Sequence, residues 1–382
     1  MAPLRSLHID IEGGRGGSSR SLYQLLSRLD RSRVMPIVAH RETGPLEEWY
    51  RNLKIATMHL PEIGSYVPRR ENSAKIFIAS IPALLKIKQA AARLLHIIEE
   101  NQIQLIHLNY EGLFLLAEQL KKSTKLPIIC HVRSHWPENI WSRWMMHSLA
   151  RSVDHLIFIS PQEESRVRAV GRGKTIDGTM VWNISPQPPV KSNSAYIPEA
   201  VYLGNLDSTK GVDRLIDLAN ALRDMDSPPL RIVIYGESRR ARPEYLAGMH
   251  QRIANEKLEE RIEFRGFTAE PEKVLAEAFA LIRPSRENDP WGRDVIEATT
   301  FGVPVLATGS FDGVVDHGVT GFLFDPFVAN EMAENLVTLV RRPELWQRMS
   351  AAASRRGETL FQGSQQAAQV TELFERHIGN GS

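Results

Sequence analysis

Residues 289–308 read DPWGRDVIEATTFGVPVLAT, a stretch that joins a helix-forming segment to an apolar run. Gly292 is expected to let the chain turn tightly into a helix, whose first free N–H groups can hold a phosphate. Two carboxylic acids, Asp289 before the turn and Glu297 in the second helical turn, could flank one ligand. The apolar run 303–307 is typical of a buried strand. The stretch therefore predicts one helix–strand unit of an α/β fold, beside a site for a ligand that is part sugar and part phosphate.

Short apolar runs alternate with amphipathic segments along most of the chain, which is typical of parallel sheets covered by helices. The strands expected in the first half are Leu4 to Ile11, Val34 to Ala39, Ile55 to Leu60, Ile103 to Leu108, Pro127 to Val132, Leu156 to Ile159 and Met180 to Trp182. Those expected in the second half are Val201 to Leu203, Leu230 to Tyr235, Ile262 to Phe264, Ala278 to Ile282, Val303 to Ala307 and Phe322 to Phe324. The pattern predicts two Rossmann-like halves of similar size.

A segment rich in proline, serine and asparagine separates these halves. Residues 184–198 read ISPQPPVKSNSAYIP, a composition that buries little and bends the chain, and we interpret them as a linker. The expected domains are then residues 1–183 and residues 199–360. Residues 361–382 contain a helical pattern with no strand after it.

The composition excludes several classes of protein. With 47 lysines and arginines against 45 aspartates and glutamates, the net charge of +2 is too balanced for a dedicated nucleic-acid binder. Cys130 is the only cysteine, so no internal disulfide can form, which suits a reducing cytoplasm. The N-terminus does not resemble a signal peptide, and no apolar run reaches the roughly 18 residues of a membrane span. We expect a cytoplasmic protein.

The stretch beginning at Asp289 resembles the acidic signature of glycosyltransferase family 4 (glycosyl transferases group 1), the retaining glycosyltransferases with a GT-B fold. That signature reads E-x-F-G-x-x-x-x-E followed by A-x-x-x-G-x-P-V. The matching positions here are Asp289 (for the first Glu), Trp291 (for Phe), Gly292, Glu297, Ala298, Gly302, Pro304 and Val305. The resemblance implies two Rossmann-like domains with a cleft between them, the first for the acceptor and the second for a nucleotide-sugar donor. It also implies a final helix that crosses back to the first domain.

In that family the first acid contacts the donor sugar and the second holds the ribose of the nucleotide. The resemblance carries these roles to Asp289 and Glu297, and we expect Trp291, Gly292 and Arg293 beside the donor. A plainer interpretation makes Arg293 and Glu297 an ordinary i, i+4 surface pair worth about 0.2–0.5 kcal/mol, with Asp289 an acid of the loop.

Residues 202–212, YLGNLDSTKGV, resemble the family pattern G-R-L-x-x-x-K-G, in which the arginine and the lysine hold the nucleotide diphosphate. Lys210 matches the lysine, but Asn205 occupies the arginine position. Losing one preorganised charge partner can cost on the order of 10²–10³ in rate if nothing replaces it. The leaving-group charge would then be met by Lys210, by helix N–H groups near Gly292, or by another arginine such as Arg15, Arg133 or Arg286.

Glycines follow the first expected strand, in the sequence Glu12-Gly-Gly-Arg-Gly-Gly17. Ser18 or Ser19 could cap a helix that begins near Arg20, and glycine permits close approach of the backbone to a ligand. The loop is similar to the glycine-rich loop of the family, so Gly16 and Gly17 are candidate donor-binding residues. The alternative is a tight turn that needs glycine for positive φ alone. NAD binding is not expected, because residues 39–41 read AHR where that fold places an acid.

Polar residues also follow the strand 127–132. A neutral His131 could hydrogen-bond a sugar hydroxyl, and Arg133 could face phosphate charge. His131 is similar to a family histidine at the same strand end, which makes it a candidate catalytic residue with Asp289 and Glu297. The alternative is a structural histidine.

The resemblance implies a retaining transfer without an obvious nucleophile, in which the acceptor attacks the face that the diphosphate leaves. No metal or cofactor is expected, because the sequence has neither a D-x-D pair on a loop nor a His/Cys ligand spacing. The substrates would be a UDP- or GDP-sugar and a saccharide or lipid-linked acceptor, in polysaccharide or glycolipid synthesis. A sugar-nucleotide 2-epimerase and a non-catalytic, transferase-like binding partner remain alternatives.

Residues 75–100 form an amphipathic pattern in which Pro82 suits the first turn of a helix. Before it, Ile76, Phe77, Ile78 and Ile81 are flanked by Arg69, Arg70 and Lys75 and could rest on an anionic membrane surface. The alternative is a helix packed on the core with a solvated basic edge.

Overall fold

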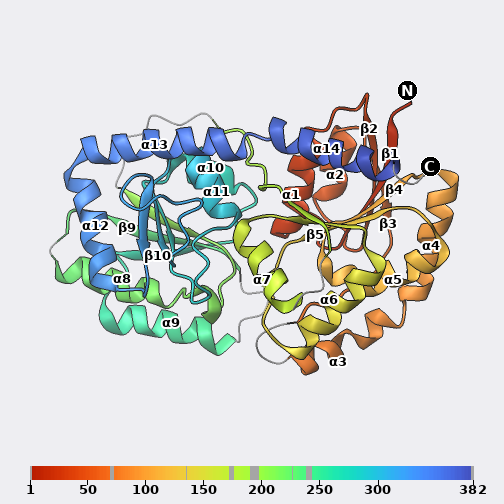
Figure 1. The fold of residues 1–382 in the computed structure, drawn as a ribbon. Coiled ribbons are helices and arrows are strands. Elements are labelled where there is room, and N and C mark those ends of the chain that lie inside the picture. Colours follow the sequence, from red (N-terminus) through yellow and green to blue (C-terminus); the bar gives the residue numbers. More distant parts are fainter. Residues whose placement is uncertain are drawn as a thin grey trace. The chain divides into compact units, whose positions relative to one another are not determined.

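The computed structural model describes residues 2–68, 73–134, 136–171, 176–189, 198–225, 227–237 and 243–379. The chain divides into two compact units (Figure 1). The first contains residues 1–184 together with 363–382, and the second contains residues 185–362. Of the linker expected at 184–198, residues 190–197 lie outside the described part, as do Arg69 and Arg70.

The first unit is built on a parallel sheet with the strand order β3-β2-β1-β4-β5-β6-β7. Its strands are β1 (Leu4–Asp10), β2 (Val34–His40), β3 (Ala56–His59), β4 (Leu105–Leu108), β5 (Ile128–Val132), β6 (His155–Phe158) and β7 (Gly178–Met180). Its helices are α1 (Gly17–Leu26), α2 (Leu46–Asn52), α3 (Ser73–Leu84), α4 (Ile87–Glu100), α5 (Phe114–Ser123), α6 (Ile140–Ser152), α7 (Pro161–Gly171) and α14 (Ser364–Gly379). A one-turn 3-10 helix, Glu111–Leu113, precedes α5.

The second unit has a parallel sheet with the order β10-β9-β8-β11-β12-β13. Its strands are β8 (Glu199–Leu203), β9 (Arg231–Tyr235), β10 (Ile262–Gly266), β11 (Ala280–Arg283), β12 (Val305–Thr308) and β13 (Gly321–Phe324). Its helices are α8 (Arg214–Asp224), α9 (Pro243–Glu256), α10 (Pro271–Glu277), α11 (Arg293–Thr300), α12 (Ala329–Arg341) and α13 (Pro343–Phe361), with a 3-10 turn η2 (Ser208–Lys210).

Helices lie on both faces of each sheet, which explains why the strands read as nearly continuous apolar runs (Figure 1). In β1, Leu7 and Ile9 face the core beneath α4, α5 and α6, whereas Leu4 belongs to the core beneath α1. Helix α14 belongs to the same core of the first unit as Leu4, because Val370, Leu373 and Phe374 pack with residues of α1. The α/β fold with two Rossmann-like sheets is therefore confirmed.

Every strand expected from the apolar runs is present, with ends that coincide with the expected ones or are displaced by one or two residues. The largest difference is at β7, which begins at Gly178 and ends at Met180 because it pairs with β6 through Leu156 and Gly178. The segment 75–100 was expected to have Pro82 in a first helical turn. Instead, Pro82 lies inside α3, which ends at Leu84, and a separate helix, α4, begins at Ile87. Among the described residues, no helix combines the length and the hydropathy that crossing a membrane requires.

Candidate functional site

Each sheet has a topological switch point, where the connections from two adjacent strands run to opposite sides of the sheet. Ligands of open α/β sheets bind at such points, beyond the carboxyl ends of the strands. In the second unit this point lies between β8 and β11, so the loop with Asn205 and Lys210 adjoins the loop with Asp289. Gly211 has a left-handed φ of 69°, and a Cβ there would collide with the carbonyl oxygen of Pro284. The amide of Arg286 donates to the carbonyl of Thr209 over 2.9 Å. Glycine is thus required for this close contact between the two loops.

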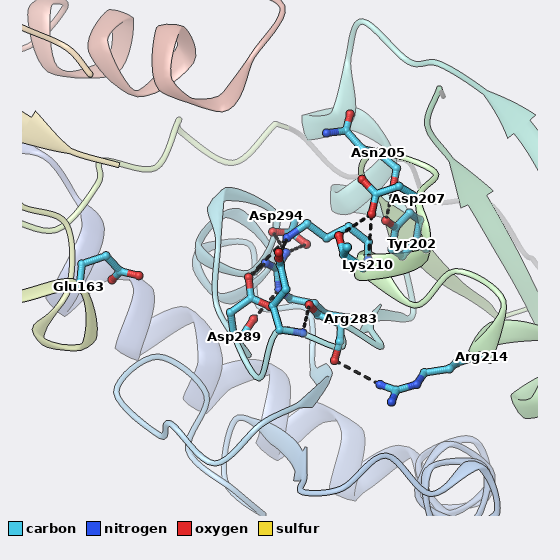
Figure 2. Close-up of polar contacts among 12 residues, drawn as sticks. Glu163, Tyr202, Asn205, Asp207, Lys210, Arg214, Arg283, Asp289 and Asp294 are labelled. Atoms are coloured by element: carbon cyan, nitrogen blue, oxygen red, sulfur yellow. Dashed lines mark hydrogen bonds and ion pairs between the residues drawn. The ribbon is translucent and has the colours of Figure 1, made fainter. Parts of the chain in front are cut away.

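This contact brings Lys210 to the acids of the second loop (Figure 2). Its Nζ pairs with the carboxylate of Glu287 and lies 3.5 Å from Oδ2 of Asp289. Asp289 and Lys210, two residues expected to hold the donor, therefore lie together. Glu287 is an additional partner of the lysine.

A buried arginine that the sequence interpretation missed holds the acids in place. Nη2 of Arg283, the last residue of β11, donates to Oδ2 of Asp289 over 2.8 Å, and its Nε donates to the backbone carbonyl of Asp289 over 2.7 Å. Its Nη1 donates to both carboxylate oxygens of Asp294, each over 2.9 Å (Figure 2). The signal in the sequence is a single charge at the end of the apolar run ALIR. Such a charge is buried only when it is paired.

The charges in this cluster set its protonation. Burial would raise the pKa of Asp289, but the positive charges of Arg283 and Lys210 outweigh burial and hold that pKa below its ordinary value. Burial would likewise lower the pKa of Arg283, whereas Asp289 and Asp294 raise it. Asp289 is therefore a carboxylate at neutral pH, able to accept hydrogen bonds from hydroxyl groups.

Gly292 has a different role from the expected one. Its φ of 167° is extended backbone that any residue adopts, so no tight glycine turn is needed. A Cβ at this position would lie 2.8 Å from Oδ1 of Asp294 and 3.0 Å from Nη1 of Arg283. Glycine is needed there because the salt bridge passes against the backbone. The start of α11 also contains an internal carboxylate, Asp294, where the sequence suggested room for a phosphate.

Arg293 and Glu297 form an ion pair along α11, but they are not an ordinary surface pair. Their side chains are only 13% and 4% exposed. Trp291, just before the helix, is also buried. The plainer interpretation of this segment was therefore wrong about exposure.

The position where the family pattern has arginine carries no charge in this chain. Asn205 is exposed, and its backbone carbonyl accepts a hydrogen bond of 2.8 Å from the hydroxyl of Tyr202. Of the cations considered as replacements, Arg286 pairs with Asp213 over 2.6 Å. The other two, Arg15 and Arg133, belong to the first unit.

The glycine loop of the first unit folds around its own acid. Helix α1 begins at Gly17, earlier than expected, and neither Ser18 nor Ser19 caps it. Instead, Ser18 donates to Glu12, whose carboxylate would collide with a Cβ at Gly16. Glycine at this position makes room for the internal anion of Glu12.

Two other glycines of the loop are needed for backbone conformation, as the alternative interpretation proposed. Gly13 and Gly14 have φ of 60° and 90°. A Cβ at Gly13 would lie 2.6 Å from the carbonyl oxygen of Glu42.

A polar cluster at the switch point of the first sheet contains Arg133, one of the expected site residues, together with Asn109, Asp10 and Ser19. Asn109, after β4, donates to Oδ1 of Asp10 at the end of β1 over 2.7 Å, and Ser19 donates to the other oxygen of Asp10. Arg133 donates from Nε to Oδ1 of Asn109 and from Nη1 to Oδ1 of Asn183, both over 2.9 Å. Arg133 is thus held by two asparagine side chains of its own unit.

His131 lies beside this cluster, near the end of β5, and is 3% exposed. Its Nδ1 lies 2.6 Å from Nε2 of His107 on the neighbouring strand. Burial, together with the charge of Arg133, lowers the pKa of His131 well below its ordinary value, so the ring is neutral at pH 7. His131 is therefore part of a histidine pair rather than a lone histidine.

Comparison with known proteins agrees with this architecture. The family model described as "Glycosyltransferase Family 4" matches residues 15–176, and that described as "Glycosyl transferases group 1" matches residues 189–356. Together the two models cover most of the chain.

Three individual proteins illustrate the likeness. The chain is 27% identical over 188 residues to an alpha-D-kanosaminyltransferase of Streptomyces kanamyceticus, covering 48% of this chain and 46% of that protein. It is 25% identical over 227 residues to a sucrose synthase of Melioribacter roseus, covering 56% of this chain and 27% of the relative. The matched segments thus span less than half the length of either relative. Among solved structures, HepE of Anabaena in complex with UDP and glucose has a TM-score of 0.77 at 20% identity, covering 98% of this chain and all of that one.

Lys210, Asp289 and Glu297 all lie in the second unit, within the segment that the glycosyl transferases group 1 model matches. The chain belongs to the GT-B glycosyltransferases, with a family 4 segment in its first unit and a glycosyl transferases group 1 segment in its second.

Proposed function

We propose that this protein transfers a sugar from a nucleotide-sugar donor to a saccharide or lipid-linked acceptor, with retention of the anomeric configuration. The observation that carries the proposal is the convergence of Lys210 and Asp289 at the switch point of the second sheet, 3.5 Å apart. A cation beside a carboxylate suits a ligand with a phosphate at one end and hydroxyl groups at the other. The family matches and the UDP complex of HepE, a similar fold, support the choice of a nucleotide sugar such as a UDP- or GDP-sugar.

Each side chain would act through its present contacts. Lys210 would exchange its partner Glu287 for the donor diphosphate, because both partners are anions and the lysine is partly exposed. Asp289, held by Arg283, would accept hydrogen bonds from hydroxyls of the donor sugar. Glu297, held by Arg293, would accept hydrogen bonds from the ribose. Trp291 and Gly292 would shape the wall beside them. In the first unit, His131 would hydrogen-bond the sugar, with Gly16, Gly17 and Arg133 nearby.

The reaction would need neither a metal ion nor a cofactor, as expected from a sequence without a metal-ligand motif. The bond between the anomeric carbon and the diphosphate oxygen breaks, and the acceptor oxygen bonds to the same face of that carbon. The proton of the acceptor hydroxyl passes to the departing diphosphate. Lys210 would stabilise the negative charge on that leaving group. Asn205 carries no charge, so the rate would rest more heavily on this single lysine.

We further propose that the protein works in the cytoplasm and rests on an anionic membrane through α3. Ile78, Ile81 and Leu85 are 64%, 38% and 78% exposed on α3 and the turn after it. The exposed Lys75 and Lys86 flank them. Apolar side chains beside lysines are typical of helices that lie in the interface of anionic bilayers. By contrast, Phe77 packs on Tyr66 and Trp141 and stabilises the helix on its unit. This placement would suit a lipid-linked acceptor in polysaccharide or glycolipid synthesis.

The test is incubation with a panel of UDP- and GDP-sugars, with and without saccharide and lipid-linked acceptors. The proposal expects release of the free nucleoside diphosphate that depends on an acceptor and persists in EDTA, with a product of retained configuration by NMR. Conversion to an epimer or free sugar without any acceptor would contradict it and indicate an epimerase. Binding of a donor with no turnover across the panel would contradict it in favour of a non-catalytic binding partner.

A further inference from the structure

Four buried side chains form a continuous line across the first sheet. Oγ of Ser6 lies 2.9 Å from Nε2 of His8, Nδ1 of His8 lies 2.9 Å from Nδ1 of His107, and Nε2 of His107 lies 2.6 Å from Nδ1 of His131. The topology makes this possible, because β1, β4 and β5 are neighbours and His8 pairs with His107 across the ladder. Ser6 lies on the same face of β1 as His8, two residues away.

The line is closed to solvent. Ser6, His8 and His107 are fully buried. The ring of Phe374 on α14 lies 5.9 Å from the ring centres of both His8 and His107. Burial lowers the pKa of His8 to about 3 and that of His107 well below its ordinary value, so both rings are neutral at pH 7.

Neutral rings leave only two arrangements of hydrogens. A neutral imidazole has one N–H donor and one bare acceptor nitrogen, and His8 and His107 each use both nitrogens in the line. If Ser6 donates to His8, then His8 must donate to His107 and His107 must donate to His131. If the first bond is reversed, every other bond reverses with it. All three bonds therefore point the same way.

The hydroxyl of Ser6 selects between the two arrangements. When it donates to His8, each polar group from Ser6 to Nδ1 of His131 has a partner. In the reverse arrangement the Ser6 hydrogen needs another acceptor, and none is found among the residues that the structure describes. The reverse arrangement leaves two buried groups without a partner in the described part of the chain, the Ser6 hydrogen and a bare Nε2 of His131, whereas the first arrangement leaves one, the hydrogen on Nε2 of His131. Each unpaired buried group destabilises the fold, so the first arrangement is favoured. The bonds therefore run from Ser6 towards His131, and the hydrogen of His131 is on Nε2.

The line ends at His131, on a nitrogen that is not used in it. Nε2 of His131 has no hydrogen-bond partner within the described part of the chain, although the side chain is 97% buried. We propose that Ser6, His8 and His107 are positioning residues that hold His131 neutral with its hydrogen on Nε2, so that His131 donates a hydrogen bond to an oxygen of the ligand. The identity of that oxygen, a hydroxyl of the donor sugar, rests on the proposed function.

The hydrogen can be located by NMR of the full-length protein labelled with ring-¹⁵N histidine. The His131 signals are assigned by their absence in His131→Asn. The proposal expects a protonated Nε2 and a bare Nδ1 for His131 in the wild type. A hydrogen on Nδ1 of His131, or a positively charged ring at pH 7, would overturn it.

Two variants of Ser6 then test the relay. Ser6→Ala removes the donor that sets the direction, so the His131 nitrogens should move towards values shared between the two tautomers. Ser6→Thr keeps the hydroxyl and should restore the wild-type spectrum. An unchanged His131 spectrum in Ser6→Ala would overturn the relay.

With an active nucleotide sugar, Ser6→Ala should also lower kcat by about three- to tenfold, the effect of one weakened hydrogen bond, and Ser6→Thr should recover it. An unchanged kcat in Ser6→Ala would overturn the role of the relay towards the ligand. If no nucleotide sugar is turned over at all, the proposed function fails while the NMR spectra still decide the direction of the relay.

Discussion

Arg283 donates from Nη2 to Oδ2 of Asp289 over 2.8 Å, so a buried cation at the end of β11 fixes the acid expected to hold the donor sugar. The same guanidinium holds Asp294 in the first turn of α11. A planar group with donors in a fixed fork suits two carboxylates at once. This salt bridge links the loop that carries Asp289 to the helix that carries Glu297.

Removing this arginine should destabilise the second unit strongly. Arg283→Leu leaves Asp289 and Asp294 buried without their shared cation, and the loss of one partner from a buried ion pair typically costs about 3–5 kcal/mol. Urea unfolding followed by circular dichroism measures this change. Lys273→Ala, which breaks an exposed pair with Glu270, is the control and should cost less than about 1 kcal/mol. Equal stability of Arg283→Leu and the wild type would show that the salt bridge does not hold this unit together.

Lys210 should carry most of the leaving-group charge, because Asn205 carries none. Lys210→Met is expected to lower kcat/KM for the nucleotide sugar by on the order of 10²–10³. Steady-state release of the nucleoside diphosphate provides the measurement, with Lys273→Met as a control on the exposed surface of the same unit. A change of less than about threefold in Lys210→Met would mean that another group neutralises the diphosphate.

The buried histidines should make the protein less stable in mild acid. The pKa of His8 is about 3 in the folded chain, below the ordinary value of 6.5, because the ring is buried. Above pH 6.5 the ring is neutral in both the folded and the unfolded chain. Between pH 6.5 and about 3 the unfolded chain binds a proton that the folded chain does not, so each such histidine lowers the free energy of unfolding by about 1.4 kcal/mol per pH unit.

The test of this slope is the free energy of unfolding at pH 7, 6 and 5. His8→Gln removes one titrating group. Below pH 6.5, its free energy of unfolding should therefore fall less steeply with decreasing pH than that of the wild type, by about 1.4 kcal/mol per pH unit. His96→Gln, on the exposed surface of α4, is the control and should keep the wild-type slope. A slope in His8→Gln equal to that of the wild type would contradict the assignment of His8 as a buried neutral ring.

The exposed apolar side chains of α3 should bind anionic membranes. Flotation with vesicles that contain anionic lipid should carry the wild type upwards, and added salt should weaken this binding because Lys75 and Lys86 contribute to it. Ile78→Ser combined with Leu85→Ser should abolish flotation. Ile140→Ser replaces an equally exposed isoleucine at the start of α6 and should have no effect. Absence of salt-sensitive flotation by the wild type would reject the membrane surface as a partner.

The apolar runs predicted the strands because parallel strands covered on both faces leave a continuous signal in the sequence. They could not predict the strand order, and both polar clusters depend on it. Lys210 reaches Asp289 only because β8 lies beside β11. The line from Ser6 to His131 exists only because β1, β4 and β5 are adjacent.

Local patterns also missed what particular side chains contact. Gly16 and Gly292 were interpreted as glycines for turns or for a ligand, whereas each makes room for an internal carboxylate, Glu12 or Asp294. Arg283 appeared to be one charge in an apolar run, because its two partners follow it in a loop and a helix whose path the sequence does not specify.

The most direct test of the proposed function is the effect of Glu297 on nucleotide-sugar turnover, measured as release of the nucleoside diphosphate from the best donor of the panel. Glu297→Ala and the isosteric Glu297→Gln should each lower kcat/KM by about a hundredfold or more, because the ribose loses hydrogen bonds to a charged acceptor. Both should keep the wild-type circular dichroism spectrum, and Glu334→Ala, exposed on α12, should keep wild-type turnover. Near-normal turnover in folded Glu297→Ala and Glu297→Gln would contradict the assignment of this acid to the donor site.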